Sequence, residues 1–136
     1  MAALRWIDTS LSFKWQCVLP ANYTADELLD EFGKAMDELR KLKPDHKLVV
    51  LTDLSQVAGS DSRRRQRIAQ FMSENRMLIS QHVLAWGFVA NGVLRGALTA
   101  LSWSRAFPVP MNVFGSRPPC DAWLNAQLAA KGHGRT

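Results

Sequence analysis

The chain has 136 residues, of which 47% are hydrophobic and 21% charged, and it carries a formal net charge of +5 at pH 7. This is the length of one ordinary domain, and the composition excludes a largely disordered chain. No apolar run approaches the ~20 residues needed to cross a bilayer, and no charged-then-apolar leader opens the chain, so a cytoplasmic protein without membrane contact is expected. Cys17 and Cys120 fall in separate segments and are expected to be buried thiols; neither a metal nor a cofactor is expected.

The charge is unevenly placed along the chain. Residues 1–58 carry seven Lys or Arg against nine Asp or Glu, a net charge of −2, whereas residues 59–136 carry ten against three, a net charge of +7. A basic surface of this kind steers acidic partners or nucleic acid, or is simply a solvated face. The second part lacks the interleaved lysines and aromatics of a single-strand binding groove, so nucleic acid is not the expected partner.

The first half of the chain predicts a hairpin, a helix and a buried strand. Apolar residues at every second position before and after the turn signal Asp8–Ser10 indicate two short strands. Thr24 followed by Glu27 forms a capping box, which begins a helix that ends before Pro44. The unbroken apolar run of Lys47–Asp53 then predicts a strand buried on both faces.

The second half alternates between helix and strand. We expect a helix over 62–82, a strand over 84–90, a helix over 93–105, a strand over 111–114 and a last helix from Pro118 through Leu128. This alternation predicts βαβ units with right-handed crossovers. The fold class is therefore α/β, with a mixed, mostly parallel sheet of about five strands and about four helices. Residues 1–130 form one domain, and residues 131–136 form a flexible polar tail.

A hydroxyl-rich loop follows the buried strand and runs into an arginine-rich helix. Ligands and partners often meet α/β sheets at the carboxyl ends of strands, beside helix N-termini. Ser62 can act as the helix cap. Ser62 can also be a phosphoacceptor, because the dianionic phosphate would lie at the positive end of the helix, beside three arginines. Ser60 is a second candidate acceptor.

Arg64 falls on the same face of its helix as the apolar stripe, one turn before the core begins. Its side chain is therefore expected to point over the carboxyl edge of the sheet. There it binds an acidic partner or anion, or pairs with Asp53 or Asp61. In the helix over 93–105, small residues beside Trp103 make a flat patch. This patch is suited to a homodimer contact or a partner groove, or Trp103 folds back over the connection that follows.

The order of these elements resembles the STAS domain, the fold of bacterial anti-sigma-factor antagonists. The matching residues are Asp53, Leu54, Ser55, Gln56 and Val57, followed by Asp61 and Ser62. In the antagonists a partner kinase phosphorylates the serine of the Asp-Ser pair and thereby ends its own binding, so the resemblance implies Ser62 as acceptor. Arg63–Arg65 stand where that family has a small residue and glycine. The segment Leu94–Leu98 with Trp103 is more similar to the small STAS-like single-domain bacterial proteins.

Sequence motifs for catalysis are absent: the chain has no Gly-Lys-Ser/Thr phosphate loop, dinucleotide-binding glycine turn or His-Glu-x-x-His pattern. His82, expected near the basic loop, is the general base that an enzyme would need. We expect instead a non-catalytic regulatory or adaptor domain that binds a protein through Ser55–Arg65 and the start of the helix over 93–105. The expected partner-binding residues are Asp61, Arg63, Arg64, Arg95 and Trp103. The alternatives are a small enzyme with a cryptic site at the sheet edge, and a binder of an anion or nucleic acid.

Overall fold

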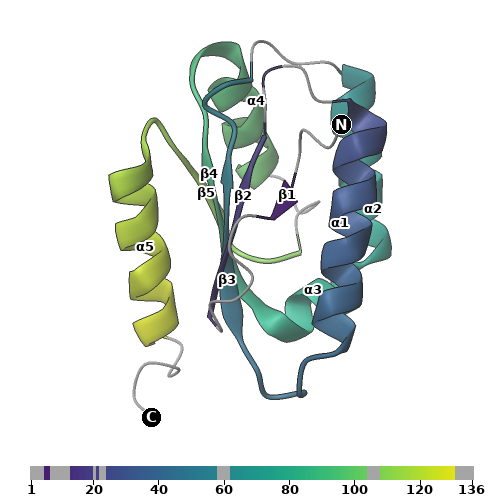
Figure 1. Cartoon of the computed structure of the whole chain (residues 1–136). Helices are drawn as coiled ribbons and strands as arrows, with labels where there is room; N and C mark the ends of the chain where they lie inside the picture. Colours follow the sequence, from purple (N-terminus) through teal and green to yellow (C-terminus); the bar gives the residue numbers. More distant parts are fainter. Residues whose placement is uncertain are drawn as a thin grey trace.

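The computed structural model describes residues 5–6, 13–19, 21, 24–57, 62–103 and 108–130 (Figure 1). Within these ranges the description leaves out the side chains of residues 5, 6, 25, 62, 64, 65, 93, 97 and 100–103. The strands are β1 (Arg5–Trp6), β2 (Lys14–Val18), β3 (Leu48–Asp53), β4 (Val83–Val89) and β5 (Met111–Phe114). The helices are α1 (Ala25–Arg40), α2 (Ser62–Glu74), α3 (Arg76–His82), α4 (Gly92–Trp103) and α5 (Arg117–Ala130).

In the described part of the chain, the strands form one sheet whose spatial order, β1-β2-β3-β4-β5, is the order of the sequence. The pairs β2–β3, β3–β4 and β4–β5 are parallel, and β1 pairs with β2 in the antiparallel direction. The predicted mixed, mostly parallel sheet is therefore confirmed: β2 to β5 make the parallel part, and the pairing of β1 with β2 gives the antiparallel edge.

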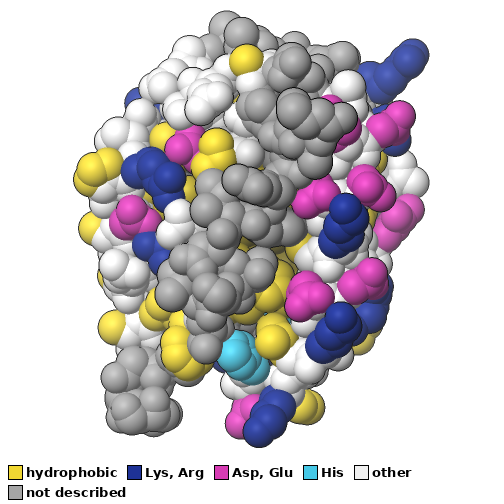
Figure 2. Space-filling view, viewed as in Figure 1, with side chains coloured by type: hydrophobic (Ala, Val, Ile, Leu, Met, Phe, Trp, Pro, Cys, Tyr) yellow, Lys and Arg dark blue, Asp and Glu magenta, His cyan; other side chains and the backbone are white. Residues whose placement is uncertain are grey.

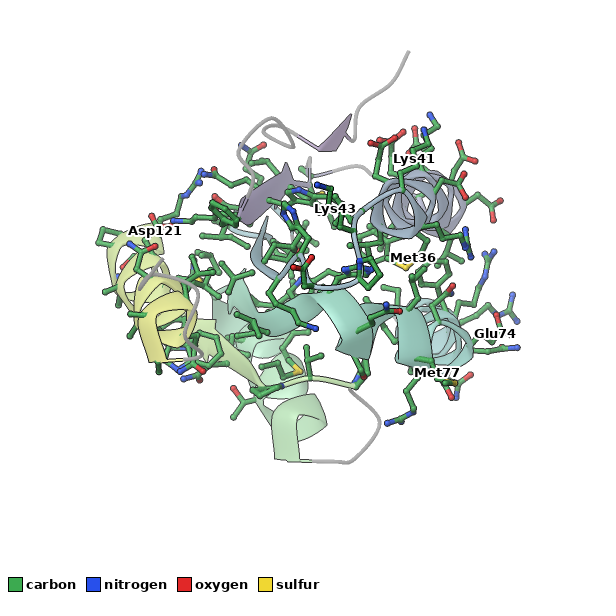
Figure 3. All side chains as sticks on the ribbon, turned by 90° about the horizontal axis from the view of Figure 1, so that it is seen from below. Met36, Lys41, Lys43, Glu74, Met77 and Asp121 are labelled. Carbon is green, nitrogen blue, oxygen red and sulfur yellow. The ribbon has the colours of Figure 1, made fainter. Side chains whose placement is uncertain are left out.

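The two faces of the sheet are covered unequally. Because the parallel strands follow one another in sequence order, right-handed crossovers place every connecting helix on the same face. Buried side chains of α1, α2, α3 and α4 accordingly join one core cluster with the strands. Of the described helices, only α5 packs on the opposite face, where Cys120 and Leu124 meet Val49, Leu51 and Ala85. Figures 1 and 3 show α5 on one side of the sheet and α1 with α2 on the other.

The prediction of a single helix over 62–82 is wrong in one respect: the segment is divided at Asn75 into α2 and α3. Asn75 has φ −108° and ψ 18°, outside helical values, and its side-chain Nδ2 donates to the Phe71 carbonyl at 2.9 Å. The Asn75 backbone N–H donates to the same carbonyl at 3.1 Å. A side-chain amide that competes for a helical carbonyl weakens the helix there. The described chain therefore has five helices rather than about four.

Most predictions at other element boundaries agree with the structure within one or two residues, but α1 ends at Arg40, earlier than the end predicted just before Pro44. The capping box of α1 is confirmed: Thr24 Oγ1 accepts from the Glu27 N–H at 3.1 Å, and Glu27 Oε1 accepts from the Thr24 N–H at 2.9 Å. β3 is buried along its whole length, as predicted. Both cysteines are buried free thiols. Within the described residues, every helix is too short or too polar to span a membrane.

Candidate functional site

The carboxyl ends of the four parallel strands lie in one row. Val18, Asp53, Val89 and Phe114 are paired in register across β2, β3, β4 and β5. The chain leaves each of these ends into a helix, so α1, α2, α4 and α5 all begin on the same side of the molecule. We call this end of the sheet, with the first turns of these helices, the carboxyl edge. It is where the sequence places the candidate loop.

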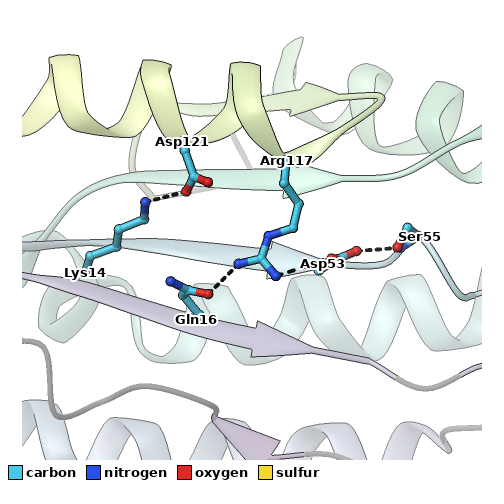
Figure 4. Close-up of polar contacts among 6 residues, drawn as sticks. All are labelled: Lys14, Gln16, Asp53, Ser55, Arg117 and Asp121. Atoms are coloured by element: carbon cyan, nitrogen blue, oxygen red, sulfur yellow. Dashed lines mark hydrogen bonds and ion pairs between the residues drawn. The ribbon is translucent and has the colours of Figure 1, made fainter.

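Asp53 organises the start of that loop. Its side chain is 10% exposed, and its Oδ1 accepts a hydrogen bond from the Ser55 backbone N–H at 2.9 Å. Its Oδ2 lies 3.8 Å from Nη1 of Arg117, the first residue of α5. Arg117 also donates through Nη2 to Oε1 of Gln16 on β2 (Figure 4). One buried carboxylate thus holds the loop backbone and the beginning of α5 together.

A second ion pair lies beside the first. Lys14 on β2 pairs with Asp121, one turn further along α5 than Arg117 (Figure 4). The two pairs join α5 to the strands at the flank of its apolar contact surface. We call Lys14, Gln16, Asp53, Arg117 and Asp121 the α5 seam. The seam ties the flank of α5, which packs on β4 and β3, to side chains of β2 and β3.

Arg95 occupies the edge at β4 and β5. It lies in the first turn of α4 and is exposed. A Cβ added to Gly115, the residue after β5, would lie 3.1 Å from Arg95 Nη1 and 3.6 Å from Oδ1 of Asn91. The glycine therefore leaves room for the guanidinium to pack beside the turn into α5. This packing places a cation where β4 and β5 end.

The structure describes only part of the predicted site. α2 begins at Ser62, as expected, and Arg63 is exposed in its first turn. The side chains of Ser62 and Arg64 lie outside the described residues, and so do Ser60 and Asp61. The phosphoacceptor roles and the pairing of Arg64 with Asp53 or Asp61 therefore stay predictions.

Trp103 does not belong to the carboxyl edge. It is the last residue of α4, whereas Arg95 is in the first turn. The two ends of this helix lie roughly 16 Å apart along its axis. Its side chain is outside the description, so the predicted homodimer or partner contact at Trp103 stays a prediction about a separate surface.

Sequence reasoning missed Arg117. The signal was the buried carboxylate of Asp53, which needs a cation or several donors to be stable in the interior. Arg64 is closer in sequence and was the expected cation. The packing of α5 on β3 and β4 brings Arg117 beside Asp53, while the side chain of Arg64 lies outside the described residues.

The placement of His82 beside the basic loop is wrong. His82 is the last residue of α3 and precedes β4, so it lies at the amino end of the sheet. It is buried, and its Nδ1 lies 2.8 Å from the His46 carbonyl oxygen. A carbonyl only accepts, so Nδ1 carries the proton.

Among the described residues, no group of three His, Cys, Asp or Glu is arranged to hold a metal ion. A groove of about 380 Å³ lies between α1 and α2, lined by Leu29, Gly33 and Phe71 among others, away from the carboxyl edge.

The strand order and the placement of the helices define a STAS-like α/β fold. The chain is similar to the crystal structure of an uncharacterized protein from the DUF3478 family, with a SpoIIAA-like fold, from Shewanella loihica PV-4. The TM-score is 0.63 at 14% sequence identity, over 90% of this chain and 92% of that chain. No family model matches the sequence, and no curated protein does either. At this identity the likeness shows the fold, and it confirms the STAS-like architecture expected from the sequence.

Proposed function

We propose that the chain, as one domain over residues 1–130, is a non-catalytic, cytoplasmic regulatory or adaptor domain that binds a protein partner at the carboxyl edge. The contacts come from the segment Ser55–Arg65 and from the start of α4. Asp61, Arg63, Arg64 and Arg95 supply the polar contacts. Phosphorylation of Ser62, or of Ser60, switches the binding.

The observation that carries this proposal is the start of α2 at Ser62, directly after the loop that leaves β3, in a chain with a SpoIIAA-like fold. Ser55, Gln56 and Arg63 are exposed around this loop. A phosphate added at the first turn of a helix is stabilised by the helix dipole, and neighbouring arginines add charge-assisted hydrogen bonds. The modification would therefore leave the fold intact while changing the charge that a partner meets.

The topology supports binding over catalysis. Ligand crevices in open α/β sheets form where neighbouring crossovers leave to opposite faces of the sheet. Here the described helices that follow β2, β3 and β4 share one face, so no such switch point lies at the end of β3, where the proposed segment begins. The buried His82 lies at the opposite end of the sheet from the proposed surface. A protein surface suits such an edge better than a small substrate does.

Site-specific photo-crosslinking in the source cells tests the proposal. A photoreactive amino acid at Gln56, exposed at the carboxyl edge, is compared with one at Asp45, exposed in the α1–β3 connection at the amino end. We expect a discrete protein adduct from Gln56, none from Asp45, and loss of the adduct in Ser62→Asp but not in Ser62→Ala. Equal adducts at both positions, or adducts at Asp45 alone, would overturn the proposal.

A further inference from the structure

We infer that the groove between α1 and α2 is the contact surface of a homodimer, in which α1 of a second copy lies antiparallel to α1 across a two-fold axis. This interface goes beyond the proposed function, because the groove lies away from the carboxyl edge. The inference follows from the apolar floor of the groove, from the order of the charges along α1 and from the open space at Gly33.

The groove has an apolar floor that the domain itself leaves partly exposed. Leu29 on α1 and Phe71 on α2 are partly exposed, and Met36 is buried between the two helices (Figure 3). Arg67 on α2 pairs with Asp26 on α1 at 2.8 Å, which holds the two helices together at one end of the groove. The groove, with a volume of about 380 Å³, is therefore a formed feature of the surface that is open to a second helix.

Charged side chains alternate in sign along α1 where it borders the groove. In chain order they are acidic, basic, acidic and basic, namely Asp30, Lys34, Asp37 and Arg40. Each of the four side chains is more than half exposed. They are three or four residues apart, so they lie on one side of the helix. Figure 2 shows acidic and basic side chains intermingled along the α1 side of the molecule.

This order of charges is complementary to itself when the helix is reversed. Two antiparallel copies of α1, related by a two-fold axis at the level of Ala35, place Asp30 opposite Arg40 of the second copy. They also place Lys34 opposite Asp37 of the second copy, and the symmetry repeats both pairs. Two parallel copies would instead place each charge opposite its own equivalent. The alternation therefore favours a second copy of this chain, in the antiparallel direction, as the occupant of the groove.

These side chains also have partners within α1, and dimerisation is compatible with that. Lys34 Nζ lies 3.0 Å from Glu31 Oε2, and Arg40 Nη1 lies 2.7 Å from Asp37 Oδ1. Exposed pairs of this kind contribute little to stability, because water solvates both charges well. They can therefore be kept, or exchanged for equivalent pairs across the interface. The complementarity depends on the order of the charges and does not require any of them to be unpaired.

Gly33 provides the point of closest approach between the two helices. Among the described atoms, none lies within 4 Å of a Cβ placed on Gly33, so packing inside the domain leaves room for a side chain there. A glycine within a helix is less stable than an alanine at the same position. The missing side chain instead lets the backbone of a second helix come close to α1 at the middle of the groove, because interhelical distance depends on the side chains at the contact.

The antiparallel arrangement leaves both carboxyl edges accessible. α1 begins at the carboxyl edge, so reversing α1 in the second copy places the two edges at opposite ends of the dimer. The dimer therefore presents the proposed partner surface twice. Dimerisation and partner binding use different surfaces, so either proposal can fail without the other.

Sedimentation velocity of the full chain over a range of concentrations tests the inference. We expect a reversible monomer–dimer equilibrium for the wild type. Lys34→Glu and Asp37→Lys should each weaken self-association about tenfold, because each places like charges opposite each other twice across the two-fold axis. The two substitutions change the net charge in opposite directions, so an effect of net charge alone would weaken one self-association and strengthen the other.

Mixing the two variants is the decisive measurement. In a mixed dimer, the Lys34→Glu chain meets the Asp37→Lys chain, and both contacts across the axis again join opposite charges. The mixture should therefore associate about as tightly as the wild type, although each variant alone is weakened. Mixing cannot repair repulsion within a single helix, so a recovery shows that the two positions face each other between copies.

Two further variants separate the interface from the stability of the fold. Gly33→Gln should weaken self-association without lowering the melting temperature of the monomer, because glutamine is the better helix former and fills the groove. Asn125→Glu adds a charge at an exposed position of α5, on the opposite face of the sheet, and should associate as wild type. Circular dichroism melts verify that each variant is folded.

Three outcomes would overturn the inference. The first is a wild type that remains monomeric up to about 1 mM. The second is a dimer that both charge variants form as tightly as the wild type; if Trp103→Ala then abolishes it, the contact lies at the end of α4 instead. The third is a mixture of the two charge variants that associates no better than either variant alone.

Discussion

Asp53 and Arg117 are joined by an ion pair whose carboxylate also fixes the loop backbone. Arg117 Nη1 lies 3.8 Å from Asp53 Oδ2, while Oδ1 of the same group accepts from Ser55 at 2.9 Å. The first turn of the candidate loop and the first turn of α5 therefore depend on one side chain. Substitutions can separate the two roles, because an amide retains the acceptor oxygen but loses the charge.

Asp53→Asn should lower the free energy of unfolding by about 1 kcal/mol, because it loses the ion pair and keeps the bond from the Ser55 N–H. Asp53→Ala should cost about 2–3 kcal/mol, since it also leaves the Ser55 N–H without its acceptor. Urea unfolding measures both values. Lys14→Met removes the neighbouring pair of the α5 seam and is the control; it should leave the amide exchange of Ser55 unchanged. Equal losses for Asn and Ala at position 53 would contradict the separate roles.

Gly87→Ala should lower the free energy of unfolding by about 1–3 kcal/mol through overpacking. An added Cβ would lie 2.6 Å from Cys120 Sγ and 3.3 Å from two side-chain atoms of Leu124, so α5 would have to move away from β4. Cys120→Ala removes the nearest atom and should recover part of the loss in the double variant. A double-mutant cycle by urea unfolding measures this coupling, and strictly additive losses would show that the close approach of α5 is not the cause.

Thr52→Val should destabilise the fold by about 1–3 kcal/mol, although the two side chains have nearly the same shape. Trp86 Nε1 donates to Thr52 Oγ1 at 2.9 Å, and both residues are buried. The valine leaves a buried indole N–H without an acceptor. Thr52→Ser keeps the hydroxyl and is the control for this hydrogen bond. Thermal unfolding of both variants tests the prediction, and a larger loss for serine than for valine would contradict it.

Both thiols should be unreactive in the folded protein. Burial raises the pKa of Cys17 from 9.0 to about 12, with the charge of Glu31 adding to the effect. Burial likewise raises the pKa of Cys120 to about 12, with Asp121 adding to it. At pH 8 each thiol then has roughly a thousandfold less thiolate than in the unfolded chain. Dithionitrobenzoate should label two thiols in denaturant and neither in the native state over the same interval.

The same shifts make stability depend on pH in the alkaline range. The raised pKa values mean that the folded chain keeps thiol protons that the unfolded chain releases above its ordinary value of 9.0. The free energy of unfolding contributed by the thiols is therefore complete below pH 9 and decreases as the pH rises toward about 12. Unfolding of wild type and Cys17→Ala across this range isolates the effect, because the variant should show the shallower slope. Parallel slopes would contradict the prediction.

Periodicity predicted most of the fold because most of it is determined by local pattern. The capping box of Thr24 and Glu27, the fully buried β3 and the bounds of β5 all follow from neighbouring residues. The break at Asn75 was missed because the residue spacing over 62–82 fits one continuous helix. Its effect comes from the side-chain amide bonding to the Phe71 carbonyl, which residue spacing does not reveal.

The candidate site was predictable as a place and less so as a set of contacts. A polar loop after a buried strand indicates the carboxyl edge from sequence alone. The partner of Asp53 depends instead on how α5, far along the chain, is positioned over the sheet. The role of Gly115 in placing Arg95 also depends on long-range packing, because Gly115 follows β5 whereas Arg95 lies on α4. Long-range packing, rather than residue type, decides which arginine serves which purpose.

The sequential order of the strands also has a consequence for synthesis on the ribosome. Each new strand can add to the one before it as it emerges, so the layer of α1, α2, α3 and α4 can assemble progressively. The apolar side chains of Val49, Leu51, Ala85 and Val89 must wait for α5, which is translated after every strand. Nascent chains that stop before Arg117 would expose this apolar face to water, and such surfaces recruit chaperones or aggregate.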